Sequence, residues 1–186
     1  TLPAMSVADF CYGVGGSIVN EPADKSGYTW TNDKNSNEEW PNVSTTAAAG
    51  DYSYSYVYRD GNGCEQNGSL SYKVHGKPEI SVAFTQGGAS VGEVCPSDGG
   101  DLVVTATVTN ASDLKGTFEY IYNGTTNASA SKTLSYGCST STFDVTAQVK
   151  YTPETNLVCV SDEKTLTIPF AAKPTLDCTN GEPTKY

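Results

Sequence analysis

The stretch GDYSYSYVYRDGNGC, residues 50 to 64, decides the fold. One alternate set of positions is aromatic: Tyr52, Tyr54, Tyr56 and Tyr58. The other alternate set is small or polar: Asp51, Ser53, Ser55 and Val57. A period of two predicts a β-strand with one buried face. Burying the serines would leave a core with almost no apolar area, whereas each buried aromatic contributes about 150 to 250 Å². We therefore expect a strand over residues 50–58 whose tyrosines face inward.

The end of this stretch predicts a hairpin. Residues 60–63 read DGNG, and Asn62-Gly63 is expected to supply the positive φ angles of a tight turn.

A second run, residues 142–151, alternates in the same way. Its apolar face carries Phe143, Val145, Ala147, Val149 and Tyr151. Further alternating runs at 101–109 and 164–170 are bounded by Gly, Asn, Asp and Pro, as strands commonly are.

Composition predicts an all-β protein. With 186 residues it can hold two domains of about 90 residues, each with its own core. Its 12 Tyr, 18 Gly and 9 Pro suit short strands and turns. A net charge of -10 disfavours nucleic acid and anionic membrane surfaces as partners, and no run is apolar enough for membrane insertion. The first residue is Thr1 rather than Met, which predicts a processed product or a piece of a longer chain.

An internal repeat divides the chain into modules. The run beginning at Cys11, CYGVGGSIV, and the run beginning at Cys95, CPSDGGDLVV, share a Cys, a Gly pair and a short apolar strand. LPAM at 2–5, KPEI at 77–80 and KPTL at 173–176 mark three module starts. We predict two tandem immunoglobulin-like β-sandwiches of roughly seven strands each, at residues 1–78 and 79–174. Residues 175–186 would be a C-terminal extension or the start of a third module.

The first module resembles a known family. CYGVGGSIV, then YTW at 28–30, then GDYSYSYVYRDGNGC followed by GSLSYKVHGKP, is similar to the immunoglobulin-like (SprB/PKD-like) repeats of large secreted surface proteins of Bacteroidetes-type bacteria. The second module matches less well, because YTPETNLVC replaces the turn before the cysteine and no Trp follows FEY. The resemblance implies an exported multi-domain adhesin, stalk or filament, and it implies no catalytic residues.

The six cysteines predict disulfides rather than a zinc site. The chain has one His and no Cys-x-x-Cys spacing, so an oxidising, extracellular or cell-surface location is expected. The candidates are Cys11, Cys64, Cys95, Cys138, Cys159 and Cys178.

Two connectivities remain open from the sequence. Pairing within modules gives Cys11–Cys64 and Cys95–Cys159. However, these cysteines would lie at opposite poles of a sandwich, about 25 Å apart, whereas bridged Cα atoms lie about 4.4 to 6.8 Å apart. Head-to-tail modules instead favour Cys11–Cys159 and Cys138–Cys178. Cys64 and Cys95 would then bond to neighbouring modules.

Catalytic and metal sites are weakly supported. His75 alternates out of phase with Leu70, Tyr72 and Val74, so we expect it to face solvent, and as the one His it offers no triad. The adjacent Glu38 and Glu39 indicate surface charge rather than a glycosidase pair. We therefore predict no enzyme, no cofactor and no metal site.

Residues 32–39, NDKNSNEE, resemble the start of a calcium loop. Asp33, Asn35 and Asn37 alternate as calcium ligands do, but Glu38 stands where such a loop needs Gly. Calcium binding stays open at this stage. Five Asn-x-Ser/Thr sequons leave glycosylation open as well: Asn42, Asn67, Asn110, Asn123 and Asn127.

The two tryptophans receive different expectations. Trp30, two positions from Tyr28, is predicted to lie in the core of its strand. Trp40, which precedes Pro41, is either anchored in the core by its loop or a candidate exposed contact.

Taken with the repeat and the cysteines, these features predict a non-enzymatic structural or adhesive repeat of an extracellular bacterial surface protein. Its sharper form is a head-to-tail filament subunit stabilised by disulfides, with neighbouring copies or modules as partners. The alternative is a carbohydrate-binding β-sandwich whose partners are surface glycans.

Overall fold

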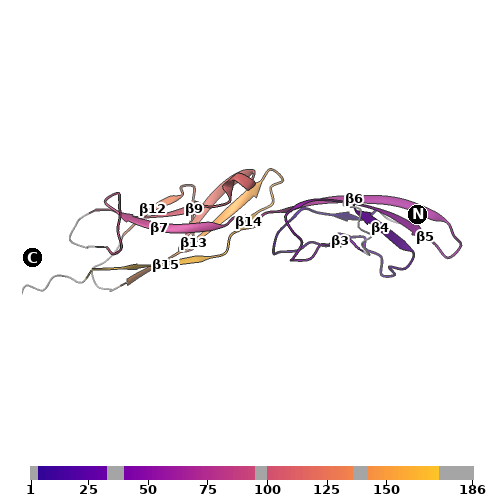
Figure 1. Cartoon of the computed structure of the whole chain (residues 1–186), viewed down its shortest axis with the longest axis horizontal. Helices are drawn as coiled ribbons and strands as arrows, with labels where there is room; N and C mark the ends of the chain where they lie inside the picture. Colours follow the sequence, from indigo (N-terminus) through magenta and orange to yellow (C-terminus); the bar gives the residue numbers. More distant parts are fainter. Residues whose placement is uncertain (1–3, 33–39, 95–99, 136–141, 172–186) are drawn as a thin grey trace, which may run out of the picture. The chain divides into compact units, whose positions relative to one another are not determined.

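A computed structural model describes residues 4–32, 40–94, 100–135 and 142–171 (Figure 1). Its contacts group the chain into two units. The first unit comprises Thr1–Pro78, Asn110–Thr117 and Lys150–Ser161. The second unit comprises Glu79–Thr109, Phe118–Val149 and Asp162–Tyr186. Residues 110–117 and 150–161, which fall inside the predicted second module, therefore group with the first unit.

The first unit is built on one four-stranded sheet. The sheet order is β2-β6-β5-β4, in which β2 is parallel to β6 and the other neighbours are antiparallel. These strands are β2 (Phe10–Cys11), β4 (Tyr28–Asn32), β5 (Gly50–Arg59) and β6 (Glu65–His75). β5 and β6 form a long hairpin (Figure 1) in which Tyr52 lies opposite Tyr72. A separate two-stranded ladder joins β1 (Ser6–Val7) to β3 (Ile18–Val19).

The tyrosine face of β5 points inward, as predicted. Tyr54 and Tyr56 are buried and Tyr52 and Tyr58 are half-buried, whereas the alternate residues of β5 are exposed. Trp30 of β4 is also buried, which confirms its predicted place in the core. The rings of Tyr52, Tyr54 and Tyr72 stack nearly parallel, within 6° of one another.

Irregular segments cover much of this aromatic face. The hydroxyl of Tyr72 donates to the carbonyl of Asn42 at 2.8 Å, and the hydroxyl of Tyr52 donates to the carbonyl of Ala48 at 2.8 Å. The backbone N–H of Asn42 donates to the hydroxyl of Tyr54 at 3.3 Å. A buried phenol needs a hydrogen-bond partner, and a loop has backbone groups that no sheet ladder uses. Residues 40–48 therefore pack on the tyrosines through polar as well as apolar contacts.

The hairpin turn between β5 and β6 is confirmed, but its predicted dihedral angles are wrong at one position. Only Gly63 has a positive φ, of 81°; Asn62 does not. The Asp60 carboxylate accepts hydrogen bonds from the N–H groups of Asn62 and Cys64, each at 2.9 Å. These two bonds hold the turn in a form that needs left-handed backbone at the glycine alone.

The second unit is a sandwich of two sheets. One sheet has the order β12-β9-β7-β8, and in the other β11, β10, β13 and β14 are neighbours while β15 also pairs with β13. The first sheet contains β7 (Ile80–Gln86), β8 (Ala89–Ser90), β9 (Leu102–Val108) and β12 (Ser131–Leu134). The second contains β10 (Gly116–Tyr122), β11 (Thr125–Asn127), β13 (Thr142–Pro153), β14 (Cys159–Val160) and β15 (Lys164–Pro169). By contacts, the first two residues of β10, the end of β13 and β14 group with the first unit.

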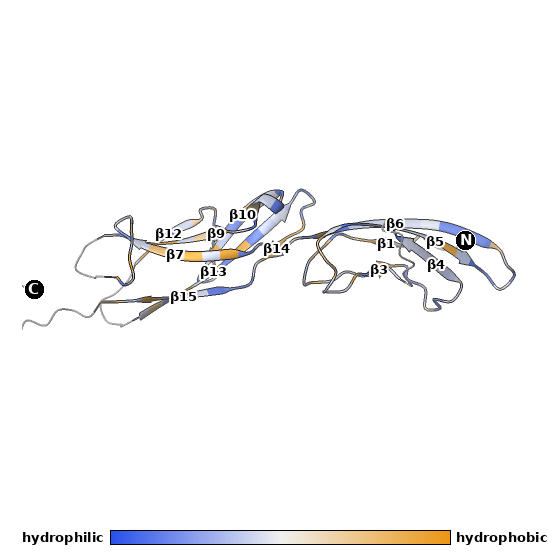
Figure 2. Cartoon of the chain, viewed as in Figure 1, coloured by the Kyte–Doolittle hydropathy of each residue, from blue (hydrophilic) through white to orange (hydrophobic). Residues whose placement is uncertain are grey.

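The core of the second unit is mainly aliphatic. Val104 of β9, Val145 and Val149 of β13 and Ile168 of β15 have no exposed surface. The alternation predicted for residues 142–151 is thus confirmed, with Val145, Ala147, Val149 and Tyr151 buried. Hydrophobic residues colour much of β7 orange in Figure 2, whereas the start of β6 is blue. Tyr122 is the one buried tyrosine of this core cluster; its hydroxyl accepts from the N–H of Ala106 at 2.8 Å and donates to the carbonyl of Ala130.

The predicted all-β class is confirmed. In the part of the chain that the structure describes, the one helical element is the short 3-10 turn η1 (Ala111–Asp113). The same residues contain no helix with the length and hydrophobicity of a membrane span.

Candidate functional site

A disulfide joins Cys11 of β2 to Cys159 of β14, with the two Cα atoms 5.6 Å apart. Both cysteines are buried, at 5% and 1% exposure. Of the two connectivities open from the sequence, the structure has the Cys11–Cys159 bond, which rules out Cys11–Cys64 and Cys95–Cys159. Cys64 is free and exposed beside the β5–β6 turn. Cys95, Cys138 and Cys178 lie outside the described residues.

His75 is buried, so the prediction that it faces solvent is wrong. Its exposed fraction is 5%. The alternation holds along most of β6, but both Val74 and His75 are buried at its end. The reason is local cover: His75 Nε2 lies 3.5 Å from Thr155 Oγ1 and 3.5 Å from Asp9 Oδ2. Neither contact could be foreseen, because Asp9 and Thr155 are far from His75 in the sequence.

The Asp9, His75 and Thr155 side chains do not form a catalytic triad. In a triad, the acid and the nucleophile bond to different nitrogens of the imidazole: the acid orients the ring through one nitrogen, and the other nitrogen takes the proton of the nucleophile. Here both oxygens approach the same nitrogen, Nε2. Asp9 is also committed elsewhere, since its Oδ1 accepts from the backbone N–H of Lys73 at 2.8 Å. This arrangement fits a structural histidine.

A cleft of about 280 Å³ in the first unit borders His75. Acidic and basic side chains share its lining, including Lys73, Asp113, Lys115 and Glu154. Lys73 also pairs with Asp51 at 3.2 Å. Because charges of both signs line the cleft, it favours neither anionic nor cationic ligands.

A larger groove, of about 480 Å³, lies beside Trp40 in the first unit. Trp40 is half-buried: its ring packs on those of Trp30 and Tyr28, with centroids 5.3 and 5.6 Å away. The ammonium of Lys25 lies over the ring, 4.5 Å from its centroid. Glu21 pairs with Lys25 at 2.5 Å. The sequence interpretation included Trp40 but missed Glu21 and Lys25, whose only signal was their spacing of four residues in EPADK.

Aromatic burial has electrostatic consequences in both units. Burial raises the pKa of the Tyr28 phenol, with the neighbouring Tyr56 and Tyr58 adding to the shift. Burial also raises the pKa of the Tyr122 phenol, against the effect of its bond from Ala106.

The indole N–H of Trp30 is buried without a hydrogen-bond partner among the described residues. Such an orphan donor costs about 1 to 3 kcal/mol.

The residues of the calcium-like segment, Asp33, Asn35 and Asn37, and the adjacent Glu38 and Glu39, expected to be surface charge, lie outside the described residues. Within residues 4–32, 40–94, 100–135 and 142–171, no group of three or more His, Cys, Asp or Glu side chains is placed to hold a metal ion. Among the sequons, Asn67 is exposed on β6, while the amide of Asn110 donates to the carbonyl of Lys77 at 3.0 Å.

Comparison with known proteins finds distant structural likenesses. No protein-family profile matches the chain. No curated protein matches its sequence either. Fibronectin(III)-like modules of Clostridium thermocellum CbhA align over 90% of this chain and 90% of theirs, at 13% identity and a TM-score of 0.33. Murine CEACAM1b aligns over 90% of this chain and 98% of its own, at 11% identity and a TM-score of 0.28.

A third likeness is to SGBP-B of the Bacteroides ovatus mixed-linkage glucan utilization locus, solved in complex with a mixed-linkage heptasaccharide. It covers 91% of this chain and 67% of that one, at 13% identity and a TM-score of 0.26. At these scores, none of the three assigns a ligand or a role to any residue of this chain.

Proposed function

We propose that this chain is a non-enzymatic structural or adhesive repeat of an extracellular bacterial surface protein. The observation that carries the proposal is the buried Cys11–Cys159 disulfide, which links residues separated by 148 positions. Disulfides persist in oxidising compartments, so the bond supports an exported location. Closing so long a loop stabilises the folded chain by about 5 kcal/mol in the chain-entropy model. Such a cross-link suits a protein that must stay folded outside the cell.

The sharper form of the proposal is a head-to-tail filament subunit. Cys64 supports it, because its thiol is free and exposed beside the β5–β6 turn. An unpaired, exposed cysteine in an oxidising compartment commonly marks a bond between molecules. The Asp60 carboxylate and the Arg59–Glu65 ion pair order the backbone on either side of the thiol. Neighbouring copies bonded through Cys64 would form covalent chains.

The disulfide map of the native assembly tests this proposal. We expect a ladder of oligomers on a non-reducing gel, collapse of the ladder with dithiothreitol, and its loss in Cys64→Ser. Asn67→Ser, an exposed change on the same hairpin, should keep the ladder. Fibres of uniform diameter in electron micrographs would support the filament form. A chain that stays monomeric at high concentration, with Cys64 still reacting with a thiol reagent, would overturn it.

A further inference from the structure

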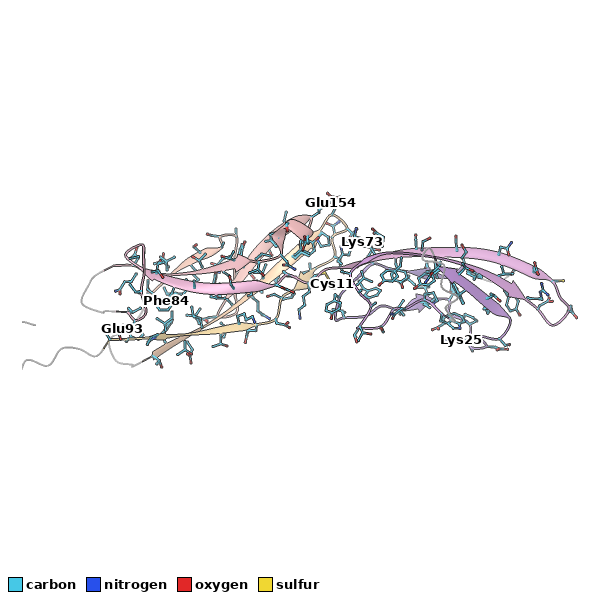
Figure 3. The ribbon with its side chains drawn as sticks, in the orientation of Figure 1. Cys11, Lys25, Lys73, Phe84, Glu93 and Glu154 are labelled. Atoms are coloured by element: carbon cyan, nitrogen blue, oxygen red, sulfur yellow. A yellow bond between two sulfur atoms is a disulfide. The ribbon has the colours of Figure 1, made fainter. Side chains whose placement is uncertain are left out.

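The groove beside Trp40 is lined by apolar and by polar side chains. Ile18, Trp40 and Val43 are apolar lining residues, and Glu21, Lys25 and Asn42, which we call the rim, supply polar groups. Its volume, about 480 Å³, lies within the range of about 300 to 1,000 Å³ typical of small-molecule sites. Figure 3 labels Lys25, on the segment between β3 and β4.

The Lys25 ammonium lies over the Trp40 ring, which lines the groove. The aromatic core holds the ring through Trp30 and Tyr28. The side chain of Lys25 is 50% exposed and that of Glu21 is 38% exposed. Exposed ion pairs are weak because water screens them, and an exposed cation over an aromatic ring is held only slightly more firmly. Displacing the ammonium from the ring therefore costs little.

The rim offers hydrogen-bonding groups of both kinds and no net charge. The Glu21 carboxylate accepts hydrogen bonds and the Lys25 ammonium donates them. Asn42 Oδ1 accepts from the backbone N–H of Ser44 at 3.1 Å and from its hydroxyl at 2.7 Å. These bonds orient the amide and leave its NH₂ group to donate to a ligand. One acid and one base balance each other, so the rim fits a neutral, polyhydroxylated ligand better than an ion.

We propose that this groove binds a neutral pyranose unit of a glycan. The apolar C–H face of the sugar would lie on the Trp40 ring in place of the Lys25 ammonium, and its hydroxyls would bond to Glu21, Lys25 and Asn42. A pyranose has the required combination of an apolar face and a hydroxylated edge. This site goes beyond the proposed structural role and does not depend on filament formation, because all its residues belong to the first unit.

Indole NMR signals offer a direct test, because the chain has only two tryptophans. The ¹⁵N-labelled full chain is titrated with soluble gluco-, xylo- and manno-oligosaccharides and, separately, with tetramethylammonium. Trp40→Phe assigns the signals. We expect at least one sugar to shift the Trp40 indole signal saturably, at millimolar concentration or below. No shift with any sugar, or a shift with tetramethylammonium alone, would overturn the proposal.

Variants of the rim keep the test independent of folding. Trp40→Ala should abolish sugar binding, but it also removes contacts with Trp30 and Tyr28. Glu21→Ala leaves the core intact and should weaken binding about tenfold, the loss expected for one charge-assisted hydrogen bond. The matched control is Glu65→Ala, which removes another exposed ion-paired glutamate of the first unit and should change the affinity less than twofold. Equal affinities for Glu21→Ala and wild type would contradict the assigned site.

Discussion

The two units bury different types of side chain, and the difference follows from what covers each core. In the second unit, aliphatic residues from two facing sheets form the core, and among its described residues Tyr122 is the one buried tyrosine. In the first unit, one sheet presents a row of aromatic rings, and the covering layer includes the irregular residues 40–48. Aliphatic side chains require nothing from the opposite layer except shape. Phenols also require backbone acceptors, which loops have free and sheets have already used.

Removing the disulfide should have the largest effect, and this effect should fall on the stability of the first unit. The Cys11→Ser/Cys159→Ser double variant is expected to destabilise the first unit by at most about 5 kcal/mol, the value for a 148-residue loop that is wholly unfolded. Trp30 and Trp40 both belong to the first unit, so tryptophan fluorescence during urea unfolding follows that unit alone. Cys64→Ser is the control and should leave the transition unchanged. An unchanged transition in the double variant would show that the cross-link does not stabilise the first unit.

Filling the space at Gly68 should disrupt the aromatic core next most strongly. Gly68 lies opposite Tyr56 in the β5–β6 pair, and a Cβ atom at this position would lie within 3 Å of the Tyr56 ring. Overpacking of this kind costs about 1 to 3 kcal/mol. We expect Gly68→Ala to destabilise the first unit by about 2 kcal/mol in the fluorescence-detected urea transition.

Gly61→Ala is the matched control, because a Cβ atom at Gly61 meets nothing within 4 Å and its backbone is not left-handed. Equal midpoints for the two variants would mean that Tyr56 does not rest on Gly68.

Removing one phenol hydroxyl should have a smaller effect. Tyr72→Phe keeps the stacked ring but leaves the carbonyl of Asn42 without this donor. A lost hydrogen bond of this type costs about 1 kcal/mol. The change should also raise hydrogen-exchange rates in residues 42–48, since the loop is held less firmly. Tyr12→Phe, at an exposed tyrosine, should alter neither stability nor exchange. Exchange rates that match wild type would refute the role of the tyrosine hydroxyls in holding the loop.

The smallest expected effect is that of Tyr122 on the second unit, where the change should appear at alkaline rather than neutral pH. Burial raises the pKa of Tyr122 above its ordinary value of about 10, so the folded unit disfavours the phenolate. Its contribution to stability is therefore complete below a pH of about 10 and is lost as the pH rises through the folded-state pKa. In Tyr122→Phe, the midpoint of unfolding, followed by far-UV circular dichroism, should fall less between pH 8 and pH 11 than it does in wild type. An identical alkaline decrease in both proteins would contradict this expectation.

The sequence was most informative where the period of the pattern decides which side of a strand is buried. The tyrosines of 50–58 and the apolar set of 143–151 could be placed correctly, because a strand turns alternate residues to opposite faces whatever it packs against. The turn at 60–64 was also predicted from the sequence, since Asp and Gly have their own local conformational preferences. Its dihedral angles were predicted less well, because the Asp60 side chain fixes the backbone in a way that the Asn-Gly dipeptide alone does not reveal.

Contacts between distant segments were beyond the reach of that argument. His75 is buried because Thr155 and Asp9 cover the end of β6, against the alternation of the strand. The groove beside Trp40 likewise depends on where residues 18–25 lie relative to residues 40–44. Loops carry no periodic signal, so their placement leaves little trace in a single sequence.

By itself, then, the sequence determined an all-β chain and the inward-facing side of its tyrosine strand. These properties depend on composition and on neighbours along the chain. Only the tertiary structure decided that Cys11 bonds to Cys159, that His75 is buried, and that Lys25 covers Trp40. Each of these depends on segments that approach one another in space, and the packing of the whole core selects such approaches.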